Sequence, residues 1–389
     1  MNGKMELLFW QLVYFFIKQR YRIIQLSNHS HEIWLESLEN KHVPIVRVVR
    51  YDIDWSQWLK RDMEYAWRIA EQIQKRRIRR FREIVNIYVS TYPPVDDWEF
   101  LIEKPLPLSQ KRNAVFRTFL IHSGNVNMSL QQLTEIVQTP IVLPTAVNDI
   151  DPFFEAERLK QDILREAREQ HERERRLFEY GKPVFTYIFI ALQVLVFLLM
   201  EWSGGSTNPA VLIQYGAKFN PLIQEGEWWR FFTPIFLHIG FLHLLMNTFA
   251  LYYLGMTVER LYGSWRFFFI YLIAGFFGTL GSFLFTTSLS AGASGAIFGL
   301  FGALLYFGTV YRHLFFQTIG TNIIGLIIIN LLFGIMVPGI DNAGHIGGLI
   351  GGFLASGIVH LPNHLDWKRQ VRTLLVTVSA AALGLYIGF

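Results

Sequence analysis

The sequence predicts a multi-pass α-helical membrane protein that is preceded by a soluble α/β domain. Hydrophobic residues make up 51% of the 389 residues, and the mean hydropathy is positive, which is unusual for a soluble protein. Of the 36 Lys and Arg and 31 Asp and Glu residues, only 14 follow Lys182, so a charged front part precedes an apolar back part. The absence of cysteine excludes disulfides, a thiol nucleophile and a cysteine-based metal site.

Residues 1–150 are predicted to form one compact α/β domain. Its first apolar run, LLFWQLVYFFI, is too short to span a bilayer and lacks a small-residue cleavage site, so we expect an amphipathic helix of the soluble domain. Helical periodicity predicts a charged helix over residues 54–83. β-Branched and aromatic content predicts the strands YRIIQL, EIWLESL, VPIVRVVRY and REIVNIYVST. Residues 151–182 are predicted to form a charged helical linker that ends near Gly181.

Two polar motifs of the front domain allow functional interpretations. The basic run KRRIRR at residues 75–80 could bind phosphates, but on a helix such a run is usually a solvated face or a contact with anionic lipid, so we expect no nucleic-acid binding. The sequence NHSHE contains His29, His31 and Glu32, which could hold a divalent metal or form a polar turn. We therefore treat a regulatory ligand or partner of this domain as a hypothesis.

Seven apolar runs after Gly181 are each long enough to span a core of about 30 Å at about 1.5 Å per residue. The predicted spans are residues 183–201, 231–254, 266–287, 292–311, 319–337, 341–361 and 371–389. Arginines and lysines between spans lie mostly on the side of the basic front domain, which predicts a plasma-membrane protein with a cytoplasmic N-terminal domain. Phe389 ends an apolar run, which is compatible with a natural protein that continues further.

Four polar residues are predicted to lie at one depth, near the outer face of the membrane. Ser294 and His345 lie near the starts of the fourth and sixth spans, and both spans are entered from outside. His243 and Asn247, four residues apart on one helix face, lie in the outer half of the second span. Because polar side chains within a membrane are costly, these residues are functional candidates.

The small residues of the fourth and sixth spans would allow their backbones to approach closely. These residues are Gly295, Gly299, Gly344, Gly348 and Gly352. Close approach would let the Ser294 hydroxyl reach the His345 imidazole, so that His345 acts as general base while Ser294 attacks a carbonyl. The backbone N–H of Ser294, with His243 and Asn247, would hold the oxyanion.

A Ser–His dyad is predicted rather than a triad, because the one acidic residue near His345 is Asp341, one turn away. Phe298, one turn after Ser294, is expected to stack on the histidine ring. No metal or organic cofactor is expected. Taken singly, Ser294 could be a packing serine, His345 a buried core histidine and Asn247 an interhelical hydrogen-bonding residue. A transporter would show inverted repeats with paired broken helices, which the sequence lacks.

These residues are where the sequence resembles the rhomboid family of intramembrane serine proteases. The family's Gly-x-Ser-Gly motif is present as Gly292-Ala293-Ser294-Gly295, and its histidine motif as GHIGGLIGG with His345. The second-span motif His-x-x-x-Asn is present as His243 to Asn247, with His238 as a further polar neighbour, and the family's loop motif as Trp229-Arg230. A charged front domain is similar to the bacterial GluP type, and Phe298 stands where some members have tyrosine.

The resemblance implies a six-span rhomboid core over residues 183–361, followed by a linker and seventh span over residues 362–389. It implies an endopeptidase that cleaves peptide bonds within or beside transmembrane segments of substrate proteins in the lipid bilayer. Its active site would open to the extracellular side. The alternative is a non-catalytic protein of the same fold that binds and escorts membrane clients, which would need neither Ser294 nor His345.

Overall fold

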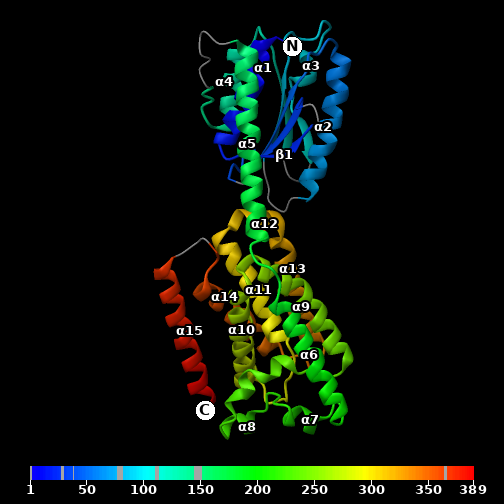
Figure 1. Ribbon diagram of the computed structural model, residues 1–389. Coiled ribbons are helices and arrows are strands. Elements are labelled where there is room, and N and C mark those ends of the chain that lie inside the picture. Colours follow the sequence, from blue (N-terminus) through cyan, green and yellow to red (C-terminus); the bar gives the residue numbers. More distant parts are fainter. Residues whose placement is uncertain are drawn as a thin grey trace. The chain divides into compact units, whose positions relative to one another are not determined.

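The computed structural model describes residues 2–27, 30–37, 39–76, 82–109, 114–143, 151–362 and 366–389 (Figure 1). The chain divides into two compact units, residues 1–172 and residues 173–389. We call them the front unit and the membrane unit.

The front unit is a mixed β-sheet between two layers of helices. In the part of the chain that the structure describes, the sheet has six strands in the order β1-β2-β3-β4-β6-β5, in which β3, β4 and β6 run parallel and the other pairs antiparallel. The strands are β1 (Arg22–Leu26), β2 (Glu32–Glu36), β3 (Ile45–Arg50), β4 (Glu83–Val89), β5 (Leu106–Ser109) and β6 (Ala114–Ile121). The first four strands lie where the sequence predicts them, whereas β5 and β6 were not predicted.

Helices α1, α4 and the first half of α5 cover one face of this sheet, and α2 and α3 cover the other (Figure 1). Their bounds are α1 (Gly3–Lys18), α2 (Ser56–Arg76), α3 (Glu99–Ile102), α4 (Val126–Val137) and α5 (Pro152–Phe178). The prediction that α1 is amphipathic is wrong. Phe9, Trp10 and Leu12 lie on different sides of α1 and are fully buried, because the helix lies in the core between the sheet and the other helices of its layer.

Helix α5 belongs to the front unit over much of its length. Ala156 and Ile163 are 1% exposed within the same core as α1, and the Lys18 ammonium lies 3.3 Å from a carboxylate oxygen of Glu166. The two units divide after residue 172, whereas the sequence predicts a domain that ends at residue 150 and a linker over residues 151–182. The apolar face of α5 explains this difference, because it packs on the core.

The described residues of the membrane unit form seven long apolar helices at the positions of the seven predicted runs. They are α6 (Phe185–Trp202), α9 (Phe241–Tyr262), α10 (Ser264–Phe285), α11 (Ser294–Val310), α13 (Gly320–Met336), α14 (Asn342–Val359) and α15 (Trp367–Gly388). By length and composition, α6, α9, α10, α14 and α15 can each span a membrane. Helix α11 is shorter, and α13 follows α12 (Arg312–Thr318) across a bend of 70°.

Large apolar side chains are exposed on α6, α9, α13 and α15, as expected for surfaces that face lipid. They include Leu195, Leu198, Met246, Phe249, Ile329, Ile335, Leu375 and Val378. We call the membrane face at which α6 begins the near face and the face at which α6 ends the far face. Consecutive spans alternate in direction, so α11 and α14 both begin at the far face.

The second span begins later than the sequence predicts. Residues 231–240 were expected to be helical, but this segment holds part of the short 3₁₀ helix η1 (Trp228–Phe231), then η2 (Thr233–Phe236) and an extended turn. Pro234 cannot continue a helical hydrogen-bond ladder, and Gly240 has a φ of +78° immediately before α9. Between α6 and η1 lie α7 (Pro209–Gln214) and α8 (Asn220–Gln224).

Glycine contacts hold α10, α11 and α14 together. A Cβ at Gly348 would collide with the carbonyl oxygen of Gly295, and one at Gly352 would collide with that of Gly299. A Cβ at Gly278 of α10 would lie 3.1 Å from both Gly295 and Gly344. Contacts in this register mean that α11 and α14 run parallel, so their first residues lie at the same depth.

Candidate active site

Ser294 and His345 contact each other directly. Ser294 is the first residue of α11 and His345 lies in the first turn of α14. The Oγ of Ser294 lies 2.9 Å from the Nε2 of His345, which is hydrogen-bond distance. His345 is only 8% exposed. The close approach of the two glycine-lined helices therefore brings together the two groups that the sequence predicts.

The ring of Phe298 stacks on the imidazole of His345. The ring centroids are 4.2 Å apart and the planes are inclined by 6°. Phe298 lies one helical turn after Ser294, so one face of α11 supplies both the hydroxyl and the stacking ring. Because two parallel rings in contact restrict tilting, Phe298 holds the imidazole plane beside the hydroxyl.

Asp341 lies close to His345 in sequence, but its carboxylate is engaged elsewhere. The backbone N–H of Gly344 donates to Oδ1 and the hydroxyl of Ser290 donates to Oδ2, each at 2.9 Å. The Nδ1 of His345 has no hydrogen-bond partner among the described residues. Asp341 is therefore the N-cap of α14 and makes no hydrogen bond to the imidazole.

Gly292 allows the imidazole of His243 to lie beside Ser294. Gly292 has a φ of +149°, and a Cβ there would lie 2.7 Å from Cε1 and 2.9 Å from Nε2 of His243. The same hypothetical atom would be 3.8 Å from the Oγ of Ser294. The backbone N–H of Ile239 donates to Nδ1 of His243 at 3.4 Å, which leaves Nε2 as the nitrogen that carries the proton in the neutral ring.

Asn247 and His238 lie on either side of His243. The Nδ2 of Asn247 donates to the backbone carbonyl of His243 at 2.9 Å, and Asn247 is 6% exposed. The ring of His238 is fully buried, and its centroid lies 5.4 Å from that of His243. The ring of His238 therefore lies next to that of His243, whereas the Asn247 amide donates within its own helix.

Two residues that support the site were missed by sequence reasoning. Lys218 and Ser290 form a backbone bridge, with N···O distances of 2.9 and 3.1 Å. The ammonium of Lys218 donates to the carbonyl oxygens of Thr286 and Ser288 at 2.7 and 3.1 Å. This bridge fixes the segment that leads into Ser294, and Ser290 connects it to Asp341. Lys218 is the single basic residue between α6 and η1, and this was the signal that could have revealed the bridge.

The two polar motifs of the front domain, KRRIRR and NHSHE, form no binding site among the described residues. Residues 77–80 of the basic run and His29 lie outside the described residues. Glu32 accepts a hydrogen bond from Nε of Arg47 at 2.7 Å. Among the described residues, no group of three or more His, Asp or Glu side chains could hold a metal ion.

Comparison with known proteins finds one family across the membrane unit. A family model described as the rhomboid domain matches residues 225–362, a range that includes all eight residues of the candidate site. The chain is 41% identical to rhomboid protease GluP of Bacillus subtilis (strain 168) over 384 residues, which cover 99% of this chain and 75% of that protein. It is 36% identical to rhomboid-like protease 1 of Toxoplasma gondii over 149 residues, or 37% of this chain and 51% of that protein. It is 39% identical to the mitochondrial RHOMBOID-like protein 6 of Arabidopsis thaliana over 167 residues, or 41% of this chain and 53% of that protein.

Proposed function

Because the chain belongs to the rhomboid family of serine proteases, we propose that Ser294 and His345 are its catalytic dyad. The observation that carries this proposal is the 2.9 Å distance between Oγ and Nε2, together with the Phe298 ring stacked on the imidazole. A non-catalytic escort needs neither the hydroxyl nor the imidazole, so this geometry favours the enzyme. The same family membership makes the chain an intramembrane protease and a multi-pass membrane protein.

In the proposed first step, Nε2 of His345 takes the proton of Ser294 while Oγ bonds to the scissile carbonyl carbon. The resulting oxyanion accepts hydrogen bonds from the N–H of Ser294, from Nε2–H of His243 and from the amide of Asn247. The N–H of Ser294 opens α11, where backbone donors have no intrahelical partner. His345 then gives its proton to the leaving amine. In the second half, His345 takes a proton from water, whose oxygen bonds to the ester carbon. His345 then returns that proton to Oγ as the bond between Oγ and the ester carbon breaks, which releases the carboxylic acid and restores Ser294.

The proposed substrates are transmembrane segments of other proteins, cut within or beside the bilayer. A peptide bond inside a helix is shielded by the helix's own hydrogen bonds, so a substrate must unwind to present an extended backbone. Small or helix-breaking residues lower the cost of unwinding. Substrates with such residues at the depth of Ser294 are therefore favoured.

The proposed topology places the front unit in the cytoplasm of a cell with the protein in its plasma membrane. Basic residues are concentrated in the connections at the near face, namely Arg260, Arg266, Arg312, Lys368, Arg369 and Arg372. By the positive-inside rule, the near face is cytoplasmic and the active site opens to the extracellular side. The front unit would regulate cleavage or dock substrates, because α5 begins in its core and is the helix that precedes α6 in the sequence.

The proposal is tested by reconstituting the full chain with a single-span substrate that carries small residues near one end of its span. We expect cleavage by the unmodified chain and by Ser356→Ala, and none by Ser294→Ala or His345→Ala. Ser356 is a matched control because it is a buried serine of α14 that donates to the carbonyl of Gly352, away from the site. A stable substrate complex without cleavage would support the escort instead.

A further inference from the structure

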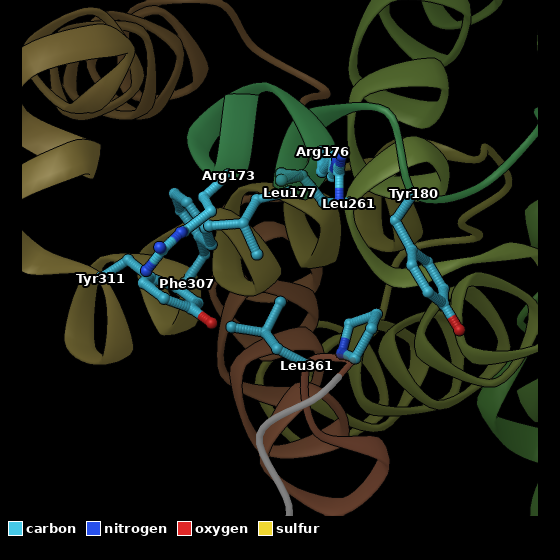
Figure 2. A pocket seen from close by; sticks show the side chains of 9 residues that line it. Arg173, Arg176, Leu177, Tyr180, Leu261, Phe307, Tyr311 and Leu361 are labelled. Carbon is cyan, nitrogen blue, oxygen red and sulfur yellow. The ribbon is translucent and has the colours of Figure 1, made fainter. Parts of the chain in front are cut away.

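The cavity shown in Figure 2 lies at the near face, and none of the candidate site residues line it. It has a volume of about 320 Å³, and its lining includes Leu261, Phe307 and Leu361. Phe307 lies thirteen residues after Ser294 on α11, or about 20 Å along the helix axis. The groups that fix Ser294 lie instead at the far face, around the connection of residues 286–293 between α10 and α11.

This connection offers little apolar surface that could hold it in place. Its sequence is TTSLSAGA, in which Leu289 is the one large apolar residue. Thr287 and Ser288 are exposed, and Ala291 and Ala293 each bury only a methyl group. Because so little apolar area is removed from water here, hydrogen bonds to the backbone decide where the connection lies.

The ammonium of Lys218 makes three of these hydrogen bonds. Lys218 is fully buried, and its ammonium donates to the carbonyl oxygens of Thr286 and Ser288 at 2.7 and 3.1 Å and to the hydroxyl of Thr286 at 3.2 Å. These three acceptors match the three N–H donors of an ammonium. Thr286 is the C-cap of α10, so the positive charge also lies at the negative end of that helix's dipole.

The backbone of Lys218 holds a second point of the connection. Its N–H donates to the carbonyl of Ser290 at 2.9 Å, and its carbonyl accepts from the N–H of Ser290 at 3.1 Å. The Ser290 hydroxyl donates to Asp341, the N-cap of α14, at 2.9 Å. Lys218 therefore fixes the chain that leads into Ser294 and, through Ser290 and Asp341, the helix start that carries His345.

Lys218 is held in turn by a neighbouring arginine. The guanidinium of Arg230 donates to the carbonyl oxygen of Ala217 at 3.0 Å, and it pairs with Glu227. Among the charged groups on the surrounding elements, Asp341 of α14 favours the ammonium, whereas the charge of Arg230 on η1 is neutralised by Glu227. Burial lowers the pKa of the Lys218 ammonium to about 8, and the charge of Asp341 opposes this decrease.

We propose that Lys218 is a positioning residue for peptide-bond cleavage, because its ammonium fixes the connection that sets Oγ of Ser294 against the imidazole of His345. This inference rests on the proposed dyad. Lys218 acts through the backbone of the connection and not on the substrate. A neutral amine has two N–H donors for the three acceptors, so loss of the proton releases part of the connection. Ser294 then spends less time in the geometry for attack, which lowers kcat and leaves KM nearly unchanged.

The test uses the full chain in neutral detergent, where both faces meet the same pH, and a single-span substrate with small residues near one end of its span. In Lys218→Met we expect kcat to fall roughly 100-fold with little change in KM, because a displacement of about 1 Å at reacting groups can cost that factor. Labelling of Ser294 by a fluorophosphonate should slow by a similar factor. The matched control is Lys368→Met, which changes an exposed lysine at the near face and should behave like the unmodified chain.

The pH dependence of kcat separates a positioning role from a purely structural one. In the unmodified chain kcat should fall as the pH rises through about 8, and be about fivefold lower one pH unit above that value, because the active form carries the ammonium. His345 accepts a proton in its neutral form, so its own titration lowers kcat at acid pH. Lys218→Arg keeps its charge up to about pH 12 and should abolish the alkaline fall.

Three results would overturn the role of Lys218: unchanged kcat and labelling in Lys218→Met, a decrease confined to KM, or an alkaline fall that persists in Lys218→Arg. If Lys218→Met does not fold, the pH profiles of the unmodified chain and of Lys218→Arg decide the question. The dyad is tested separately by Ser294→Ala in the same assay. Cleavage that is lost in Ser294→Ala but intact in Lys218→Met would overturn only the role of Lys218, whereas cleavage by Ser294→Ala would overturn the dyad.

Discussion

At the residue scale, the contact between Ser294 and His345 depends on neighbouring glycines, which have no side chain. Gly292 gives space to the His243 ring, and Gly295 lets α14 approach until its own Gly348 nearly touches the α11 backbone. The polar side chains nearby, Asp341 and Ser290, hydrogen-bond at the starts of α11 and α14 and not to the imidazole of His345. Asp341 is occupied by Ser290 and Gly344, so packing against Phe298 orients His345.

The first prediction concerns Asp341. If Asp341 is only a cap and a support, the oxygen of Asp341→Asn can still accept from the Gly344 N–H, and its NH₂ group can donate to the Ser290 hydroxyl. The value of kcat should therefore fall by less than about tenfold. In a Ser–His–Asp triad the same change costs roughly 10⁴-fold. Steady-state cleavage of a single-span substrate distinguishes these outcomes, and a loss near the larger figure would restore the triad.

The second prediction concerns the stacking ring. Phe298→Leu keeps most of the buried volume but removes the flat surface under the imidazole, so kcat should fall roughly 10- to 100-fold with little change in KM. Phe298→Tyr retains the ring and should stay close to the unmodified chain. Equal activity of the leucine and tyrosine variants would show that the stack does not position His345.

At the element scale, the sequence predicts helices well where a long run of apolar residues is present. Each of the seven apolar runs corresponds to a helix, and Ser294 and His345 could be placed at one depth from the lengths of the runs alone.

The start of α9 was missed because Pro234 and Gly240 interrupt an apolar run that is otherwise uniform. Strands β5 and β6 were missed because the sequence around them does not show clearly where a turn ends and a strand begins. Asn247 was predicted as an oxyanion donor, and its bond to the His243 carbonyl depends on side-chain geometry that no sequence pattern encodes.

The start of α6 depends on one buried acid of α9. Glu259 is fully buried, and it accepts hydrogen bonds from the backbone N–H groups of Val184, Phe185 and Thr186 at 2.8–2.9 Å. It also accepts one from the hydroxyl of Thr186 at 2.7 Å. A carboxylate at this position satisfies the unpaired donors that every helix start presents and complements the positive end of the helix dipole.

The third prediction is that Glu259→Gln destabilises the membrane unit. The amide supplies one acceptor fewer and turns an NH₂ group toward buried donors, which should lower the free energy of unfolding by about 2 kcal/mol. For a unit of this size, that loss corresponds to a decrease in Tm of roughly 5 °C. The exposed Glu225, changed to Gln, is the matched control. Equal melting of the two variants would contradict the capping role.

At the scale of the whole molecule, the chain joins two units with separate cores. The front unit has its own buried charge cluster between β2, β3 and α2. Arg47 is 1% exposed and lies 2.7 Å from both Glu32 and Asp62, with further hydrogen bonds to Asn86 and Tyr88. The sequence showed only that charges crowd into the front part, because a buried arginine and a surface arginine look alike in composition.

The fourth prediction uses Arg47 to test whether the front unit and the membrane unit unfold independently. Arg47→Met leaves two carboxylates near an apolar group, which should lower the free energy of unfolding of the front unit by about 2–4 kcal/mol. Two calorimetric transitions are expected, of which only the front unit's moves. Cleavage of a minimal single-span substrate should persist, whereas cleavage of natural substrates should change if the front unit docks or regulates them. A single transition that shifts as a whole would contradict the division into two units.

The measurement that tests the account most directly is covalent labelling of the folded full chain with a fluorophosphonate, mapped by peptide mass spectrometry. A hydroxyl activated by an adjacent imidazole should form one adduct on Ser294, absent in Ser294→Ala and slower by roughly 10²- to 10⁴-fold in His345→Ala. Labelling that persists in Ser294→Ala, or no adduct on chain that melts normally, would contradict a nucleophilic Ser294.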